Sequence, residues 1–204
     1  MKDFLSFAYQ TEPDFSLLAL KAPFEEIARR FSDIHRAKKR IHNVPLRQTQ
    51  EFELVDSRFV SIVEVRGGPW VIIFRSVLCS VEEEIDVSVR DAKSLSAYLK
   101  TKAIAFIGES TSDAMRYQIF AKGKMLEAAE WTSGCGVNSF ESKVNRKPLL
   151  EGTGDDFADN VFRSEGIYLP ACYCRCENGT SWLAAESASV TSITRVDFIL
   201  KPAG

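Results

Sequence analysis

The sequence predicts an α+β protein in which two to three helices pack on one side of a largely antiparallel mixed sheet. Short runs of β-branched and aromatic residues recur along the 204-residue chain, and Gly-containing turns separate several of them. Two stretches have the spacing of an amphipathic helix, and a third, shorter one follows late in the chain. This order of segments favours one sheet covered by a small number of helices.

The first two predicted elements are a strand over residues 15–21 and a helix that follows it. Pro23 suits the first turn of a helix, because a backbone N–H is not needed there. Apolar residues then recur at helical spacing over residues 24–34. We expect the helix to end near Ala37, because Lys38 would fall on its apolar stripe.

The middle of the sheet is expected at a strand over residues 70–74, which pairs with a strand over residues 59–65 through a reversal at Gly67 and Gly68. Two successive glycines tolerate positive φ and therefore allow the chain to turn back. The strand over residues 70–74 is apolar on both alternating faces, which is typical of a strand covered on both sides.

A second helix is expected to start at Ser88. Its hydroxyl would accept a backbone N–H, and Asp91 would lie in the first turn, where the helix dipole favours negative charge. The acidic run just before it, residues 82–86, is interpreted as a solvated loop. A hard-cation site is the weaker alternative, because no glycine spaces the oxygens of this run.

A strand and a hairpin follow the second helix. The strand is predicted over residues 103–107, and Gly123 marks the turn between the two strands of the hairpin, residues 117–120 and 125–131.

The chain is predicted to divide into three parts. Residues 1–131 form the α+β core, residues 132–152 form a loop of small and polar residues, and residues 153–204 supply a C-terminal helix and strands that complete the same domain. Within the last part, a short helix is expected to end at Gly166. A strand over residues 167–176 is expected after it.

The residue order from Trp70 to Glu127 resembles that of uncharacterised bacterial proteins with a strand, helix, strand and hairpin. The resemblance covers roughly a third of the chain. It rests on turn, cap and core positions that include Trp70, Asp91, Leu99, Tyr117, Gly123 and Glu127. It implies a bacterial protein of the kind suspected to be partners of toxins or stress systems. It implies no activity and no functional residue.

The composition is that of an ordinary globular protein and disfavours several functional classes. The net charge of −2 gives no bulk attraction to nucleic acid or membranes. No stretch reaches the roughly 18 consecutive apolar residues of a membrane span, and the first residues do not open a signal peptide. Five cysteines without the spacing of a secreted scaffold favour the cytoplasm. No serine elbow or phosphate loop is present, so no cofactor is predicted.

The basic segment from Arg29 to Arg47 is the first candidate site. It carries a net charge of about +6, with Asp33 as its one acidic residue. Its candidate binding residues are Arg36, Lys38, Lys39, Arg40 and Arg47. An acidic protein partner fits this charge better than nucleic acid, because no aromatic residue interleaves the cations for base stacking. For this segment, a solvated helix end that suits the helix dipole is favoured over a binding surface.

Four cysteines form the second candidate site. Cys172, Cys174 and Cys176 would share one face of a strand, and Cys135 is a possible fourth thiolate for zinc. Core packing is the favoured interpretation, because free cysteines are usually buried and no Cys-x-x-Cys pair is present.

The sequence therefore predicts a non-enzymatic cytoplasmic interaction protein of the immunity or stress type. The alternative is a metal-binding or redox protein that uses the cysteines. A third hypothesis, a hydrolase, depends on a pocket around Glu109 and Asp113, two carboxylates beside a loop that follows a strand.

Overall fold

The protein, analysed as a computed structural model, contains one large antiparallel sheet. The structure describes residues 15–37, 39–41, 58–65, 69–75, 81–109, 114–144, 160–161, 164–167, 171–175, 181–185 and 193–200. The strands of the main sheet are β1 (Phe15–Leu20), β2 (Lys39–Ile41), β3 (Arg58–Val65), β4 (Val71–Arg75), β5 (Lys102–Glu109), β6 (Ala114–Ala121), β7 (Lys124–Thr132), β8 (Gly136–Ser142) and β11 (Ile193–Leu200).

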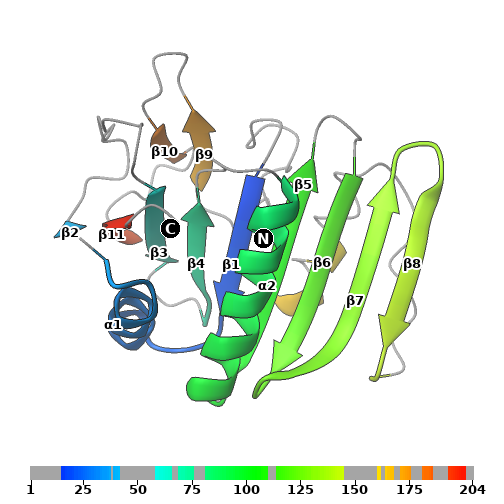
Figure 1. Cartoon of the computed structure of the whole chain (residues 1–204), viewed down its shortest axis with the longest axis horizontal. Helices are drawn as coiled ribbons and strands as arrows, with labels where there is room; N and C mark the ends of the chain where they lie inside the picture. Colours follow the sequence, from blue (N-terminus) through cyan, green and yellow to red (C-terminus); the bar gives the residue numbers. More distant parts are fainter. Residues whose placement is uncertain are drawn as a thin grey trace.

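The order of these nine strands across the sheet is β2-β11-β3-β4-β1-β5-β6-β7-β8 (Figure 1). Each neighbouring pair in the described sheet is antiparallel. The α+β prediction is therefore confirmed. The prediction that the sheet is mixed is wrong for its described part.

Two helices, α1 (Phe24–His35) and α2 (Val81–Tyr98), lie on the same face of this sheet. Helix α1 packs against β11 and β3, whereas α2 crosses β1, β5 and β6 (Figure 1). Strands β7 and β8 extend beyond α2, and no helix of the described chain crosses them on this side (Figure 1).

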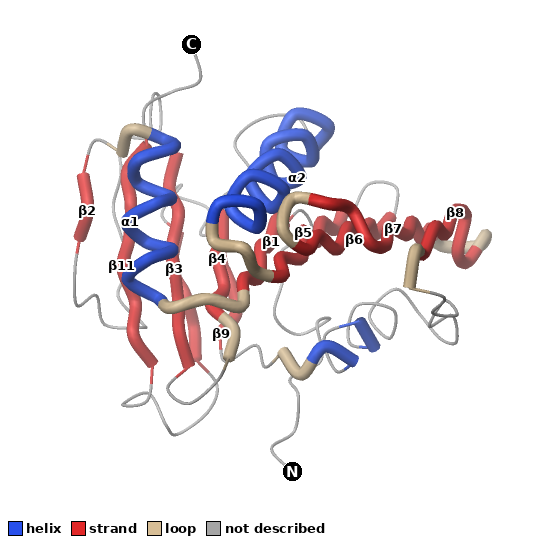
Figure 2. The backbone as a smooth tube through the Cα atoms, turned by 90° about the horizontal axis from the view of Figure 1, so that it is seen from below, coloured by secondary structure: helices blue, strands red, loops and turns tan. Residues whose placement is uncertain are grey.

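Short helical pieces, residues 160–161 and 164–165, lie on the opposite face of the sheet (Figure 2). The indole Nε1 of Trp70 donates to the carbonyl oxygen of Glu165 at 3.1 Å, and the Glu165 carboxylate is 2.5 Å from Nζ of Lys102. These contacts attach the second piece to the sheet. The prediction that all helices lie on one side of the sheet is therefore wrong for these helical pieces.

The core consists of two apolar layers, one on each face of the sheet. The layer under the helices is formed by buried residues that include Leu18, Leu20, Ile27, Phe31, Ile62, Ile73, Leu95, Ala105, Phe120 and Phe198. The layer on the opposite face includes Leu17, Ile72, Ile104, Phe106, Ile119, Trp131, Val161 and Ile167. Because β4 contributes to both layers, the prediction of a strand covered on both sides is confirmed.

Helix α1 has the boundaries that the sequence predicted. Pro23 stands before its first turn, and the helix ends at Arg36, which has a left-handed backbone with φ 46°. The N–H of Ala37 then donates to the carbonyl oxygen of Ser32 at 3.1 Å. This bond satisfies one of the carbonyls that every helix end leaves without a partner in the helix.

Helix α2 begins seven residues earlier than the start predicted at Ser88. The hydroxyl of Ser88 is fully buried inside the helix and lies 2.5 Å from the hydroxyl of Ser16 in β1. The acidic run over residues 82–86 belongs to the first turns of α2, so the loop interpretation was also wrong. Negative charge is favourable there because the N-terminal end of a helix carries partial positive charge.

The hairpin of β6 and β7 confirms the turn predicted at Gly123. Lys122 and Gly123 both have positive φ, 51° and 79°, as a tight two-residue hairpin turn requires. In the strands, the buried carboxylate of Glu127 accepts hydrogen bonds from the hydroxyls of Tyr117 at 2.8 Å and Ser142 at 3.0 Å. Because Ser142 belongs to β8, this network joins three strands.

Strand β8 corrects the predicted loop over residues 132–152. It pairs with β7 across most of its length, and its side chains are half-buried or exposed. The part of that loop from residue 145 onward lies outside the described residues.

The late elements follow the prediction only in part. Gly166 ends the second of the short helical pieces with φ 69°, as expected. Strand β9 (Ala171–Arg175) pairs with β10 (Ser181–Ala185) in a separate two-stranded sheet. Strand β11 instead enters the main sheet between β2 and β3.

Candidate functional site

The predicted basic segment follows α1 into β2. Arg36 is exposed at the end of α1, and the backbone of Lys39 lies in β2. Nη2 of Arg40 is 2.8 Å from the carboxylate of Glu25, and its guanidinium lies 5.7 Å from the centre of the Phe198 ring. Arg40 is therefore partly committed to contacts within the protein. Lys38 and Arg47 lie outside the described residues.

The carboxylate of Glu64, in β3, has a raised pKa beside this segment. Burial is the main cause, because it disfavours the charged form, and the negative charge of Glu25 adds to it. The ionised carboxylate therefore costs stability above this raised pKa. The cost disappears as the pH falls below the ordinary value of 4.5.

We expect Glu64→Gln to make the protein slightly more stable at about pH 7, by less than about 1 kcal/mol because water screens a half-buried group. At about pH 4 the gain should largely disappear, since Glu64 is then mostly protonated in the folded and unfolded chains alike. Urea unfolding at the two pH values measures the difference. An equal gain at both would contradict the assigned cause.

The other predicted sites are only partly described. Glu109 ends β5, where its backbone pairs with Ala114, whereas Asp113 lies outside the described residues. Cys172 and Cys174 lie in β9, where their backbones pair with Ala184 and Trp182. Cys176 lies outside the described residues. The carboxylate and thiolate sites therefore stay predictions.

Cys135 is exposed in the turn between β7 and β8, where its N–H donates to the carbonyl oxygen of Thr132 at 3.2 Å. Both views place this turn well away from β9 (Figures 1 and 2). Within the residues that the structure describes, no three potential metal ligands come together.

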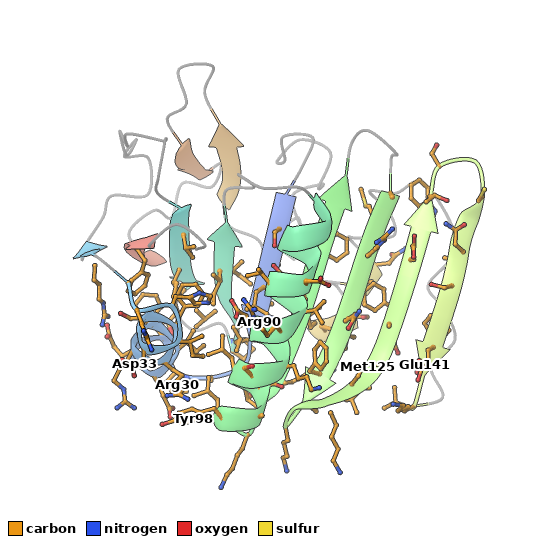
Figure 3. All side chains as sticks on the ribbon, in the orientation of Figure 1. Arg30, Asp33, Arg90, Tyr98, Met125 and Glu141 are labelled. Atoms are coloured by element: carbon orange, nitrogen blue, oxygen red, sulfur yellow. The ribbon has the colours of Figure 1, made fainter. Side chains whose placement is uncertain are left out.

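Five lysines gather at one end of the sheet, where α2 ends and the β6–β7 hairpin turns. They come from three parts of the chain, and we call them the lysine end: Lys21, Lys93, Lys100, Lys122 and Lys124. All five are exposed, and none forms an ion pair within the described part of the protein. Long side chains that end in nitrogen project from this end (Figure 3).

Hydrogen bonds of Thr101 join the chain segments that form the lysine end. Its hydroxyl donates to the carbonyl oxygen of Lys21, and its carbonyl oxygen accepts the N–H of Lys122 at 2.9 Å. The N–H of Gly123 donates to the hydroxyl of Ser96 in α2 at 2.9 Å. The backbone segments that carry Lys21, Lys100 and Lys122 are thus joined to one another.

Three basic residues, two of them at the lysine end, have a backbone conformation that is unusual for residues other than glycine. Arg36, Lys100 and Lys122 are the non-glycine residues with positive φ in the described chain, and all three are basic. Glycine or asparagine is the usual choice at such positions, because a Cβ clashes with the neighbouring carbonyl. Cations near the ends of α1 and α2 suit the helix dipole, but Lys122 lies in a hairpin turn and has no such reason to be basic.

A hollow beside α2 is a further candidate site, in addition to the lysine end. It has a volume of about 110 Å³ and lies between α2 and the strands β5 to β8. Its lining includes Val89, Ala105, Ile107, Arg116, Gln118, Ala128, Glu130 and Ser139. Across the strands, Nη2 of Arg116 lies 3.1 Å from Oε1 of Glu130. The hollow therefore offers apolar walls and both signs of charge.

No protein-family model, curated protein or solved structure matches the chain. The class of the protein consequently rests on its own architecture, an antiparallel α+β sheet with two helices on one face. The resemblance to uncharacterised bacterial proteins stays a prediction. The lysine end and the hollow are the two surfaces of the described chain that bear on function.

Both surfaces were missed by the sequence analysis. The lysine end had a partial signal in two short basic runs, Lys100-Thr101-Lys102 and Lys122-Gly123-Lys124. Nothing in the sequence shows that these runs meet, because a hydrogen bond between their backbones brings them together. The hollow had no sequence signal, since its lining alternates with core residues on four strands.

Proposed function

We propose that the protein is a non-enzymatic interaction protein whose lysine end receives an acidic segment of a partner protein. The supporting observation is the group of five exposed lysines without ion-pair partners in the described part of the chain. The carboxylates of an acidic partner would complement these positive charges. The fixed backbones around Thr101 reduce the ordering cost of binding.

Two observations favour an acidic protein over nucleic acid. The net charge of the chain is −2, so a long nucleic acid would meet net negative charge beyond the lysine end, whereas a short acidic segment would not. The aromatic ring beside the lysine end is that of Tyr98, and the guanidinium of Arg30 lies 3.9 Å from its centre (Figure 3). A base would have to compete with Arg30 for this face of the ring.

The cellular setting is part of the same proposal. A bacterial cytoplasmic protein of the immunity or stress type would use such a surface to hold an acidic toxin or regulator. Within the described chain, neither helix is long and apolar enough to cross a membrane. The segment with Arg36 and Arg40 would extend the basic surface on the α1 side.

The test compares two triple variants with equal changes in charge. Lys100→Glu, Lys122→Glu and Lys124→Glu reverse the lysine end, whereas Arg29→Glu, Arg90→Glu and Lys143→Glu reverse exposed cations elsewhere. With poly-L-glutamate as the probe at low salt, the lysine variant should lose affinity by about tenfold or more, while the control stays near the natural protein. Added salt should weaken the natural binding.

Thermal melting of both variants establishes that they are folded. Equal losses in the two variants, or a larger loss in the control, would refute the lysine end as the binding surface. Tighter binding of a DNA duplex than of poly-L-glutamate would refute the protein partner and favour nucleic acid.

A further inference from the structure

The hollow beside α2 is built from residues on both sides of a junction between helix and sheet. Val89 of α2 forms one wall together with Ile107 of β5, and both side chains are apolar. Two small residues, Ala105 and Ala128, lie in the lining, where larger side chains would occupy the space. The hollow therefore exists because alanines stand next to a helix that leaves β7 and β8 uncovered.

Opposite charges lie side by side in this hollow. Arg116 and Glu130 are directly opposite each other on β6 and β7, and their side chains are 44% and 32% exposed. Their ion pair joins one guanidinium nitrogen to one carboxylate oxygen. A guanidinium has five N–H donors and a carboxylate has two oxygens, so each group has further capacity for hydrogen bonds. The pair can accept a ligand without being broken.

The size of the hollow limits what it can hold. A volume of about 110 Å³ is somewhat smaller than a cavity of roughly 150 Å³ that binds benzene. The part of a ligand that enters the hollow must therefore be small. The amide of Gln118 and the hydroxyl of Ser139 add polar groups to the lining.

We propose that this hollow binds a free α-amino acid with a short aliphatic side chain. The ligand carboxylate would bind Arg116, its ammonium group would bind Glu130, and its side chain would lie against Val89 and Ile107. A zwitterion matches both charges at once, whereas a simple carboxylate would meet the repulsion of Glu130 and a simple amine that of Arg116.

This site is separate from the lysine end and does not depend on the proposed function. None of the five lysines belongs to the lining of the hollow, although Val89 lies one helical turn from Lys93. An amino acid ligand would make the protein a sensor of a small metabolite as well as an interaction protein.

The first part of the test uses three probes of the same shape. L-valine has both charged groups, isovalerate has only the carboxylate, and isobutylamine has only the ammonium group. Titration followed by amide chemical shifts in NMR should show saturable binding of L-valine, with shifts around β6 and β7. Isovalerate and isobutylamine should bind about tenfold more weakly or not at all.

The second part uses variants of the lining. Arg116→Gln and Glu130→Gln should each weaken L-valine binding by about tenfold, and Ala128→Leu should abolish it by filling the space. Glu141→Gln, on β8 outside the lining, is the matched control and should bind as the natural protein does. Absence of saturable L-valine binding, or equal binding of isovalerate, would overturn the proposal. Full affinity in Ala128→Leu would overturn it too.

Discussion

Replacing His35 with alanine is expected to lower the free energy of unfolding by about 3 kcal/mol, because the change removes a hydrogen-bonded ion-pair partner of a buried carboxylate. Nε2 of His35 lies 2.7 Å from Oδ2 of Asp91, and the Asp91 side chain is only 1% exposed. The pair joins the end of α1 to the middle of α2. The imidazole also packs on Phe31, with ring centres 4.4 Å apart.

A double-mutant cycle isolates the contribution of this pair. His35→Ala, Asp91→Ala and the double variant are compared by urea unfolding at neutral pH. The loss in the double variant should be smaller than the sum of the two single losses by more than about 1 kcal/mol. Strict additivity would show that the two side chains stabilise the fold independently.

The second large effect is expected at Gly123. An alanine Cβ there would lie 2.7 Å from Cβ of Ala97 in α2, closer than packed carbon atoms approach, and the residue has φ 79°. Both the strained backbone and the contact with Ala97 oppose the substitution. We expect Gly123→Ala to lower the free energy of unfolding by about 2 kcal/mol or more.

Gly134 provides a matched control for this prediction. It has the same φ of 79°, but no heavy atom would lie within 4 Å of its added Cβ. Gly134→Ala should therefore show the backbone strain alone, about 1 kcal/mol. Adding Ala97→Gly to Gly123→Ala should restore part of the lost stability. Equal losses at the two glycines, measured by thermal unfolding, would show that the contact with Ala97 has no role.

Much of the described fold was predictable because its signals are local. The helical spacing over residues 24–34 and the turn at Gly123 each lie within a few residues, and the structure confirms both. The pairing of β3 with β4 also followed from the reversal between them. Such features depend on backbone sterics and hydrophobic periodicity, which one segment of sequence contains.

The errors occur where distant contacts override a local signal. Ser88 resembles a helix cap in sequence, yet its hydroxyl meets Ser16, which is 72 residues away. Strand β8 looks like a loop, because most of its residues are small or polar. It forms a strand by pairing with β7 at the edge of the sheet, where exposed polar side chains are tolerated.

The candidate surfaces were the least predictable part. A run of cations such as residues 36–40 is visible in sequence, whereas Lys21, Lys100 and Lys122 are far apart until backbone hydrogen bonds with residues 101 and 102 bring them together. Likewise, Arg116 and Glu130 face each other only because the β6–β7 register pairs them. Charge clusters made by tertiary structure have no linear signature.

Strand β11 has a consequence for how the protein is made. Strand β11, residues 193–200, pairs with β2 on one side and with β3 on the other. During synthesis, the edge of β3 that pairs with β11 therefore stays exposed until β11, more than a hundred residues later in the chain, has left the ribosome. Closing so long a loop is slow, and the exposed edge can meanwhile pair with other nascent chains. The exposed edge therefore needs protection until residues 193–200 are free to pair with it.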